Sequence, residues 1–388
     1  MKQETSRPGW WHVTEVAELP SPSLLVYPQR VEENLKRMLA IAGAAERLRP
    51  HIKTHKMREP IELLKRLGVT KFKCATIAEA ELAANTGVAD LLLAYQPVGP
   101  AARRVAELVR QFRLVRFSVV CDDEAAIREL SAAISSLPHR GSAAARLARA
   151  SQREIEVLID LDIGQHRTGV PAGPEAVALY QLVASLPGLK PGGLHAYDGH
   201  LSEPDPVQRA HACESAFAPV IALRQQLQAA GLSVPRIVAG GTPTFPFHAK
   251  RGDVECSPGT CVFWDAGYAS KLRDLDFMPA ALVLTRIVSK PGGNRLCLDL
   301  GHKAIASEMP HPRVKFLDLD EAQAVMHSEE HLVIETSRSG EFKVGNCLYG
   351  VPWHICPTVA LHSEAFVVED GKAVGTWEVA ARERRLTV

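Results

Sequence analysis

The sequence has no run of about eighteen apolar residues, no CxxC pair and no basic stripe with interleaved aromatic residues. The first absence excludes a transmembrane helix, and the polar start at 1–11 lacks the apolar segment of a signal peptide. A formal net charge of +1 makes nucleic acid and anionic membrane poor candidates as partners. We therefore expect an ordinary globular protein.

The eight cysteines are scattered along the chain and do not form the spacing pattern of a disulfide framework. This distribution fits a reducing cytoplasm, where most cysteines are buried as small hydrophobic residues. Cys356 differs from the other cysteines in that it forms an H-x-C motif with a histidine two residues before it.

At 388 residues, with 46% hydrophobic and 23% charged residues, the chain is long enough for two globular domains. From residue 23 to about residue 240, short apolar strand patterns alternate with amphipathic helix patterns. About eight such units predict an α/β fold, a (β/α)8 TIM-type barrel, with a doubly wound open sheet as the alternative. The Ala/Arg-rich stretch 138–152 is expected to be a surface insertion.

After about residue 265 the pattern changes to strands joined by turns, without a convincing helix. We expect strands at 280–289, 295–300, 331–335, 342–348, 365–369 and 373–378. The predicted domains are therefore a barrel at 22–265 and a C-terminal all-β domain formed by 1–21 plus 266–388.

Lys53 is the most informative residue, because it ends the apolar strand pattern at 48–53, which is counted as the second barrel strand. An ammonium group loses hydration at the end of a buried strand, and burial lowers the pKa of a lysine. A lysine in that position is a usable amine nucleophile for a carbonyl. The alternative is a charged residue that merely ends a strand.

Other polar groups also follow predicted barrel strands, where the chemistry of such barrels is located. Asp160-Leu-Asp-Ile-Gly-Gln-His-Arg167-Thr-Gly follows the sixth strand and His195-Ala-Tyr197-Asp-Gly-His200 the seventh. Gly240-Gly241-Thr242 follows the eighth, and Ser257-Pro-Gly259-Thr260 comes after the next strand. These two glycine turns offer exposed N–H groups and hydroxyls for a phosphate, although two ordinary turns would look the same.

In the second domain, His354-Ile-Cys356 lies within Gly-Val-Pro-Trp-His-Ile-Cys-Pro-Thr. If this segment is a strand, positions i and i+2 share a face, so the imidazole and the thiolate can bind one cation together. Two ligands make an incomplete site, and an isolated H-x-C is more often coincidental than functional.

Together these motifs resemble the D-threonine aldolase / D-serine dehydratase family of fold-type III pyridoxal phosphate enzymes, which are related to alanine racemase. The resemblance covers nearly the whole chain. It rests on Arg-Pro-His-Ile-Lys53-Thr-His-Lys, Asp-Ile-Gly-Gln-His-Arg167-Thr-Gly, Gly-Gly241-Thr-Pro-Thr, Ser-Pro-Gly259-Thr-Cys-Val-Phe-Trp-Asp and Pro-Trp-His354-Ile-Cys-Pro-Thr.

The resemblance implies that Lys53 carries pyridoxal 5'-phosphate as an imine. It further implies that Arg167 contacts the cofactor's phenolic oxygen and that Tyr197 approaches the pyridine nitrogen. The implied phosphate ligands are Gly241, Thr242, Gly259 and Thr260, and the implied ligands of a divalent metal are His354 and Cys356. A homodimer is implied as well.

The metal motif and the rest of the chain favour different reactions within this family. Aldolases of the family commonly carry His-x-Asp, whereas the dehydratases carry His-x-Cys, as here at Cys356. A thiolate favours zinc over manganese or magnesium. The surrounding sequence nevertheless looks more like that of the aldolases.

The resemblance therefore implies a lyase for a D-amino acid with a β-hydroxyl group. We place D-threonine aldolase, which breaks the Cα–Cβ bond, slightly ahead of D-serine dehydratase, an ammonia-lyase. Lys53 would be catalytic, and the bases considered for the hydroxyl are His55, His195 and His200.

Two other classes remain as alternatives. An amino-acid racemase would need a tyrosine such as Tyr268 or Tyr349 opposite Lys53. A pyridoxal phosphate carrier of the single-barrel type would have no use for the second domain.

Overall fold

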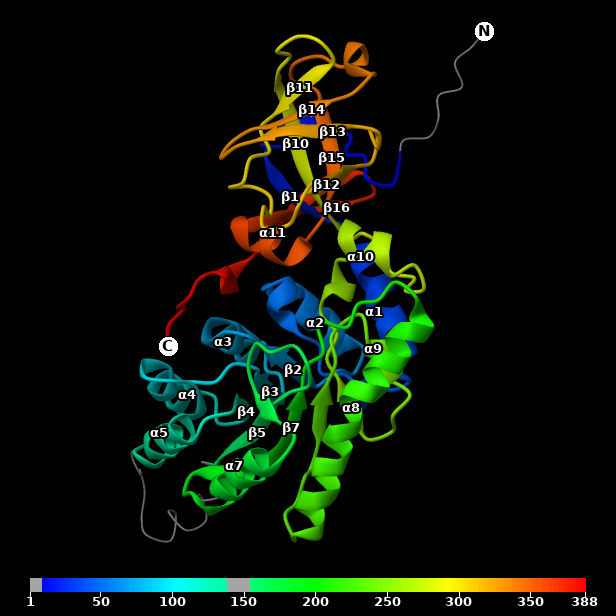
Figure 1. The fold of residues 1–388 in the computed structure, drawn as a ribbon. Helices are drawn as coiled ribbons and strands as arrows, with labels where there is room; N and C mark the ends of the chain where they lie inside the picture. The colour runs from blue at the N-terminus through cyan, green and yellow to red at the C-terminus, as the bar shows by residue number, and fades with distance from the viewer. Residues whose placement is uncertain (1–8, 138–153) are drawn as a thin grey trace. The chain divides into compact units, whose positions relative to one another are not determined.

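The computed structural model describes residues 9–137 and 154–388, and the chain divides into two compact units. One unit contains the chain up to Leu35 together with Val262–Ala380, and the other contains Lys36–Cys261 together with Ala381–Val388. The insertion expected at 138–152 falls outside the described residues. Figure 1 shows the course of the chain through both units.

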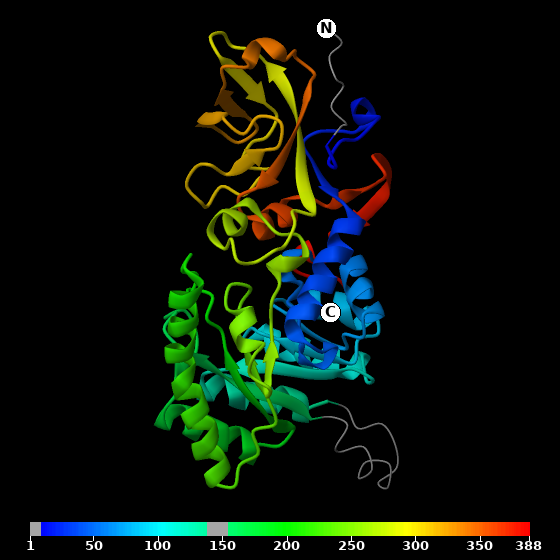
Figure 2. The same cartoon turned by 90° about the vertical axis from the view of Figure 1, so that its right-hand side faces the viewer.

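The unit of Lys36–Cys261 is built on a parallel sheet with the strand order β2-β3-β4-β5-β7-β8-β9, and the short β6 pairs with β5. Its strands are β2 Lys71–Cys74, β3 Asp90–Leu93, β4 Arg116–Cys121, β5 Ile155–Asp162, β6 Val170–Pro171, β7 Leu189–Ala196, β8 Ile237–Ala239 and β9 Val254–Cys256. Its helices are α2 Arg58–Arg66, α3 Ile77–Asn85, α4 Pro100–Gln111, α5 Glu124–Ser135, α7 Pro174–Ser185, α8 Pro206–Ala229 and α9 Phe245–His248. Figures 1 and 2 show the longer helices outside the strands, as a TIM-like barrel requires.

The predicted strand at 48–53 is reduced to two bridge residues followed by a 3-10 turn at Ile52–Thr54. Leu48 pairs with Cys256 of β9 and His51 pairs with Lys73 of β2, both in the parallel sense. This short segment therefore connects the two outer strands of the sheet. Pro50 has no N–H group to extend the ladder, but its carbonyl accepts from Lys73 N at 2.9 Å.

The interior of the barrel is apolar at its centre and charged or polar at both ends. Leu92, Val120, Leu158 and Val238 form its apolar cluster. Side chains two residues apart on a strand share a face, so residues at i−2 and i+2 also point inward. Those positions before the cluster include Asp90, Glu156 and Arg236, and those after it include Asp160. The chemistry therefore belongs above the cluster, at the carboxyl ends of the strands.

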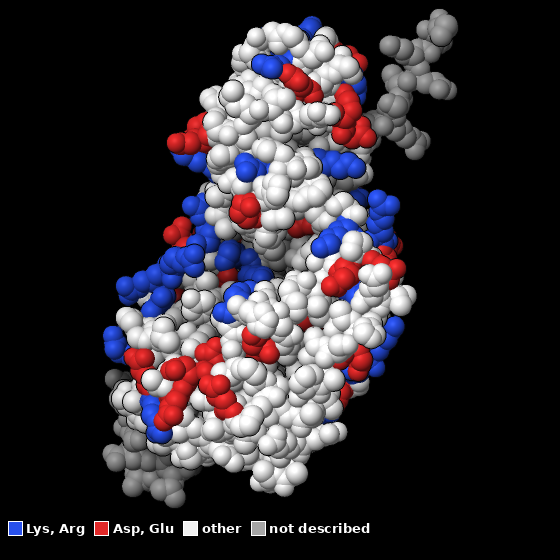
Figure 3. Space-filling view, viewed as in Figure 1, with Lys and Arg blue, Asp and Glu red and all other residues white. Residues whose placement is uncertain are grey.

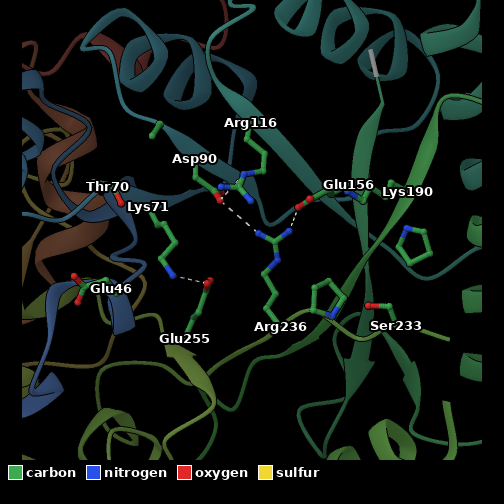
Figure 4. Close-up of a pocket in the computed structure, with 13 residues that line it drawn as sticks. Glu46, Thr70, Lys71, Asp90, Arg116, Glu156, Lys190, Ser233, Arg236 and Glu255 are labelled. Carbon is green, nitrogen blue, oxygen red and sulfur yellow. Dashed lines mark hydrogen bonds and ion pairs between the residues drawn. The ribbon is translucent and has the colours of Figure 1, made fainter. Parts of the chain in front are cut away.

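A network of ion pairs fills the amino-terminal end of the barrel, beside a cavity of about 580 Å³ (Figure 4). The fully buried Arg49 donates to Asp90 at 2.6 Å and to Glu255 at 2.7 Å. Lys71 pairs with Glu255 at 2.6 Å, and Arg236 pairs with Asp90 at 3.4 Å. Burial alone would raise the pKa values of both carboxyl groups, but Arg49 outweighs it and holds both pKa values below their usual range.

This network predicts a loss of stability in acid. A carboxyl group whose pKa is lower in the folded state stabilises the fold above its unfolded pKa of about 4. That stability disappears as the pH falls through the folded value. Asp90→Asn, which removes one of the two carboxylates paired with the buried Arg49 and also the carboxylate paired with Arg236, is expected to cost about 3–5 kcal/mol of unfolding free energy at pH 7. The difference from wild type should shrink as the pH falls from 5 towards 3.

Chemical denaturation at several pH values measures this difference. The control is Asp253→Asn, which removes a half-exposed partner of Arg224 and should change the unfolding free energy by less than about 1 kcal/mol. A pH-independent difference for Asp90→Asn would contradict the explanation.

The other unit contains a mostly antiparallel nine-stranded sheet. Along the main path the strand order is β13-β14-β11-β10-β1-β16-β17, while β15 pairs with β10 and β12. Its strands are β1 Ser23–Val26, β10 Ala281–Ser289, β11 Arg295–Leu298, β12 Val314–Phe316, β13 Gln323–His327, β14 Leu332–Glu335, β15 Cys347–Pro352, β16 Glu364–Glu369 and β17 Lys372–Glu378. Its helices are α10 Ala266–Lys271 and α11 Ile355–Leu361, and α1 Pro28–Ala42 spans the division between the units.

The interpretation of 23–27 as the first barrel strand was wrong. β1 pairs with β10 in the antiparallel and with β16 in the parallel sense, so it belongs to the second sheet. All four of its residues are buried. A strand that is buried on both faces has the same sequence pattern in either sheet, so only the pairing distinguishes them.

The C-terminal part also contains a helix that the sequence pattern did not indicate. The strand expected at 342–348 is β15, which begins at Cys347 and runs on to Pro352, and α11 follows it directly. His354 is the N-cap residue of α11, and Cys356 lies in its first turn. The expectation that these two side chains share one face of a strand was therefore wrong.

The described residues also bear on membrane-spanning helices and on the distribution of surface charge. No described helix combines the length and the apolar character that crossing a membrane requires. On the face drawn in Figure 3, acidic and basic side chains lie in several separate groups rather than in one continuous basic band.

Candidate active site

Lys53 lies in the 3-10 turn Ile52–Thr54, directly after the segment that connects β9 and β2. Its backbone N–H donates to His51 Nδ1 at 3.3 Å, which holds the start of the turn. The side chain is half-buried, and no hydrogen bond or ion pair of its Nζ is recorded among the described residues. The turn therefore presents an uncommitted amine, as an amine nucleophile requires.

The ring of Tyr197 lies at the centre of a group of cationic side chains. Lys53 Nζ is 5.7 Å from the ring centroid, Lys73 Nζ is 5.5 Å from it, and Arg167 Cζ is 5.0 Å from it. A Cβ atom at Gly199 would lie 2.2 Å from the Tyr197 hydroxyl, so this close approach requires glycine. The residues assigned to the cofactor from the sequence, Lys53, Arg167 and Tyr197, are thus neighbours in the structure.

Asp160 and His195 form a buried pair beside this group. They occupy facing positions on β5 and β7, and His195 Nδ1 lies 2.6 Å from Asp160 Oδ1. Burial, the largest contribution, lowers the pKa of His195, whereas the Asp160 carboxylate opposes this. Burial would raise the pKa of Asp160, but the charge and hydrogen bond of His195 lower it. The neutral ring therefore donates Nδ1–H to Asp160, and its buried Nε2 has no recorded partner.

The two glycine turns expected to hold a phosphate converge on one hydroxyl. Gly259 N and Thr260 N each donate to Thr242 Oγ1 at 3.2 Å. A Cβ atom at Gly259 would lie 3.0 Å from the carbonyl oxygen of His51, so the turn packs tightly against the Lys53 segment. Gly241 differs, because its N–H donates to the buried Asp198 at 3.0 Å.

The carboxylate of Asp198 stabilises the Gly240–Thr242 turn through hydrogen bonds. It also accepts from Thr244 Oγ1 at 2.7 Å and lies 2.8 Å from His248 Nε2. Cys213 Sγ is 3.4 Å from the same His248 nitrogen, which makes Asp198, Cys213 and His248 a compact group of metal-ligand type among the described residues. The His248–Asp198 contact is a direct hydrogen bond, and we interpret the group as a support for the Gly240–Thr242 turn.

The structure separates the three histidines considered as bases. His55 is fully buried, and its Nδ1 accepts from Met57 N at 3.2 Å. Burial lowers the pKa of His55 to about 3, which together with this contact favours a structural role. His200 is exposed, whereas His195 is buried and oriented by Asp160.

The second unit brings His354 and Cys356 together with a third side chain. His354 Nδ1 lies 2.5 Å from Glu308 Oε1. Burial alone would lower the pKa of His354, but the hydrogen bond to Cys356 and the contact with Glu308 raise it to about 9. Asp265 fixes the adjoining helices, because its carboxylate accepts from Ile355 N at 3.1 Å and from Tyr268 N at 2.9 Å.

The residues fit the groups that the resemblance implies. For pyridoxal phosphate, the uncommitted Lys53 amine, the unpartnered His195 Nε2 and the converging N–H groups of Gly259 and Thr260 provide the required donors and acceptors. For a divalent metal, the imidazole of His354, the thiol of Cys356 and the carboxylate of Glu308 are suitable ligand types.

Sequence reasoning missed three residues of these sites: Lys73, Asp198 as the loop support, and Glu308. Lys73 precedes the end of β2 by one residue, so a second lysine near a barrel strand end was a usable signal. Glu308 stands 46 positions before His354 in sequence. Only the fold brings these two residues together.

Comparison with known proteins agrees with this fold. Residues 26–266 match the family model "Alanine racemase, N-terminal domain", and residues 280–368 match "Putative serine dehydratase domain". The D-threonine aldolase of Arthrobacter sp. is 30% identical over 95% of this chain and 94% of its own length. The 3-hydroxy-D-aspartate aldolase of Paracoccus denitrificans (strain Pd 1222) is 28% identical over 94% of this chain and 93% of its own.

A solved structure extends this similarity to three dimensions. The crystal structure of D-threonine aldolase from Filomicrobium marinum superposes with a TM-score of 0.84 at 27% identity, covering 95% of this chain and 96% of that one. A parallel barrel with a strand-end lysine, followed by a mostly antiparallel domain, defines the alanine racemase-like class. Within this class the chain belongs to the D-threonine aldolase / D-serine dehydratase family of fold-type III pyridoxal phosphate enzymes.

Proposed function

We propose that this protein is a pyridoxal phosphate- and divalent-metal-dependent lyase that cleaves D-β-hydroxy-α-amino acids, with D-threonine aldolase activity. The observation that carries the proposal is 30% identity to a D-threonine aldolase over 95% of the chain. The uncommitted amine of Lys53 and the oriented imidazole of His195 support it.

Each part of the site has a proposed task. Lys53 binds the cofactor, Arg167 and Tyr197 contact its ring, and Gly241, Thr242, Gly259 and Thr260 hold its phosphate. When bound, the cofactor supplies an electron sink for charge that develops at the substrate's Cα. His354 and Cys356, with Glu308 beside them, hold a divalent metal, which supplies a Lewis acid that lowers the pKa of a hydroxyl group.

His195 is the proposed base for the β-hydroxyl group. Asp160 fixes the tautomer of His195 by accepting a hydrogen bond from its Nδ1–H group. The Nε2 atom of His195 therefore has a free electron pair at neutral pH. In the aldol route, Nε2 takes the hydroxyl proton, the Cα–Cβ bond breaks and an aldehyde leaves. The remaining two-carbon amino acid gains a proton at Cα and becomes glycine.

D-serine dehydratase activity is the second candidate, favoured by Cys356 and by the domain matched at 280–368. A thiolate ligand selects zinc over the harder manganese or magnesium. In this route the Lys53 amine removes the α-proton of the substrate and the β-hydroxyl leaves as hydroxide. The hydroxide takes up a proton and leaves as water, and the released enamine tautomerises to an imine that water hydrolyses to a keto acid and ammonia.

Product analysis distinguishes these functions. The protein, loaded with cofactor and zinc or manganese, is incubated with D-threonine, D-serine and 3-hydroxy-D-aspartate. Glycine with acetaldehyde or glyoxylate supports the aldolase, whereas 2-oxobutyrate, pyruvate or oxaloacetate with ammonia supports the dehydratase. L-threonine is the control and should remain unchanged. Conversion of added D-alanine to L-alanine without a metal would instead establish a racemase. If all the amino acids remain unchanged, the proposal is contradicted.

Three further properties complete the proposal. We expect zinc as the metal, a homodimer as the assembly and the cytoplasm as the location. The first rests on Cys356, the second on the family resemblance and the third on the scattered cysteines, which form no disulfide among the described residues. The domains are proposed to be 22–265 and 1–21 plus 266–388, except that Ser23–Val26 pairs with strands of the second domain.

A further inference from the structure

Lys73 has an unusual position inside the barrel. It lies on β2, where its register partners are His51 on one side and Leu92 of the apolar cluster on the other. Residues in register on neighbouring parallel strands point to the same face, so the stem of Lys73 runs along the apolar interior. Only 2% of the residue is exposed. Its amine nevertheless reaches the site, 5.5 Å from the centroid of the Tyr197 ring.

This buried amine has no recorded hydrogen bond or ion pair among the described residues. Two half-buried lysines of the same unit do have carboxylate partners. Lys71, two residues earlier, pairs with Glu255, and Lys56 pairs with Glu79. A buried ammonium group without a hydrogen-bonded or charged partner destabilises the folded state. The presence of such a group at Lys73 therefore indicates a role other than stabilising the fold.

The neighbouring carboxylates do not provide the missing partner. Asp160 is engaged by His195 and Thr168, and Asp198 is engaged by Gly241, Thr244 and His248. Burial first, and then the charge of Lys53, lower the pKa of Lys73 to about 7. A negative charge brought close to the Lys73 amine would raise its pKa and keep the amine protonated.

We propose that Lys73 is a ligand-binding residue whose amine contacts an anionic oxygen of the molecule held at Lys53. The proposal rests on the function proposed above. Lys53 Nζ and Lys73 Nζ lie 5.7 and 5.5 Å from the centroid of the same Tyr197 ring, so a molecule that Lys53 holds against this ring can also contact Lys73. The oxygen belongs either to the ring of the cofactor or to the carboxylate of the amino-acid substrate.

The test uses Lys73→Met, which keeps the length and apolar character of the stem but removes the charge and the donors. The cofactor affinity of the substrate-free protein is measured by titration of its visible absorbance, and KM is measured with the best substrate found. A charge-assisted hydrogen bond to a cofactor oxygen predicts a loss of cofactor affinity of about 10- to 100-fold. If only KM rises by that factor, the oxygen is that of the substrate carboxylate.

The cofactor-free protein provides a second readout. Because Lys73→Met removes an uncompensated buried charge, its unfolding temperature without cofactor should equal or exceed that of the wild type. A residue kept only for structure would show the reverse, with a lower unfolding temperature and unchanged binding. Lys73→Gln retains N–H donors without the charge, and we expect its loss of affinity to be intermediate.

Lys71→Met is the matched control, since it removes a lysine of the same strand that already has a partner within the barrel. Its cofactor affinity and KM should remain those of the wild type. Unchanged affinity and unchanged KM in Lys73→Met would overturn the inference while leaving the proposed function intact. A wild-type protein that binds no cofactor would overturn both.

Discussion

Replacing Lys53 by alanine is expected to reduce kcat/KM by on the order of 10³-fold or more, because this amine is the group proposed to hold the cofactor covalently. The protein should also fail to develop the visible absorbance of a cofactor held covalently. The turn itself should persist, since its start depends on the backbone contact between Lys53 N and His51 Nδ1 rather than on the side chain.

The matched variant is Lys53→Arg, which keeps a cation in the same turn but cannot form an imine with an aldehyde. If the role of Lys53 is covalent, the arginine variant should be as inactive and as colourless as the alanine variant. If the role is only electrostatic, arginine should restore a large part of the activity. Wild-type absorbance in either variant would place the cofactor on another residue.

Loss of the metal is expected to have the second-largest effect. Cys356→Ala removes one of the proposed ligands, and we expect zinc affinity to fall by at least about 10- to 100-fold. Because a bound divalent cation acts as a Lewis acid, activity should fall together with metal occupancy and should be abolished by a chelator. Metal analysis of the purified protein and titration of the metal-free protein measure both quantities.

Two further variants sharpen this test. Cys356→Asp replaces a soft ligand by a hard one, so the preference of the site should shift from zinc towards manganese or magnesium. Cys297→Ala removes another partly buried cysteine of the same unit and should leave metal binding unchanged. Full activity of chelator-treated wild-type protein would remove the metal from the mechanism.

The sequence predicted the barrel well where helices and strands alternate with clear turn signals. Asp123, for example, caps α5 by accepting a hydrogen bond from Ala126 N at 2.8 Å, and the helix begins at Glu124. The prediction failed where local patterns are ambiguous. β1 is buried on both faces and carries no periodicity that assigns it to one sheet.

The site was predictable to the extent that it depends on strand ends. His195 lies near the carboxyl end of β7, Tyr197 follows the same strand, and Lys53 and Arg167 lie beyond other strand or bridge segments of the same sheet, so their proximity follows from the topology. The segment proposed to bind a metal was less predictable, because the H-x-C spacing was interpreted as part of a strand, whereas α11 begins at Ile355. Lys73 escaped notice because the sequence does not reveal whether a buried lysine has a partner.

The most direct test of the account is to map the position of the bound cofactor. The cofactor-loaded protein is reduced with borohydride, which converts an imine to a stable secondary amine, and its peptides are analysed by mass spectrometry. The account predicts a pyridoxyl group on Lys53 and on no other lysine. A label on the nearby Lys73, or no label on a protein that retains activity, would contradict it.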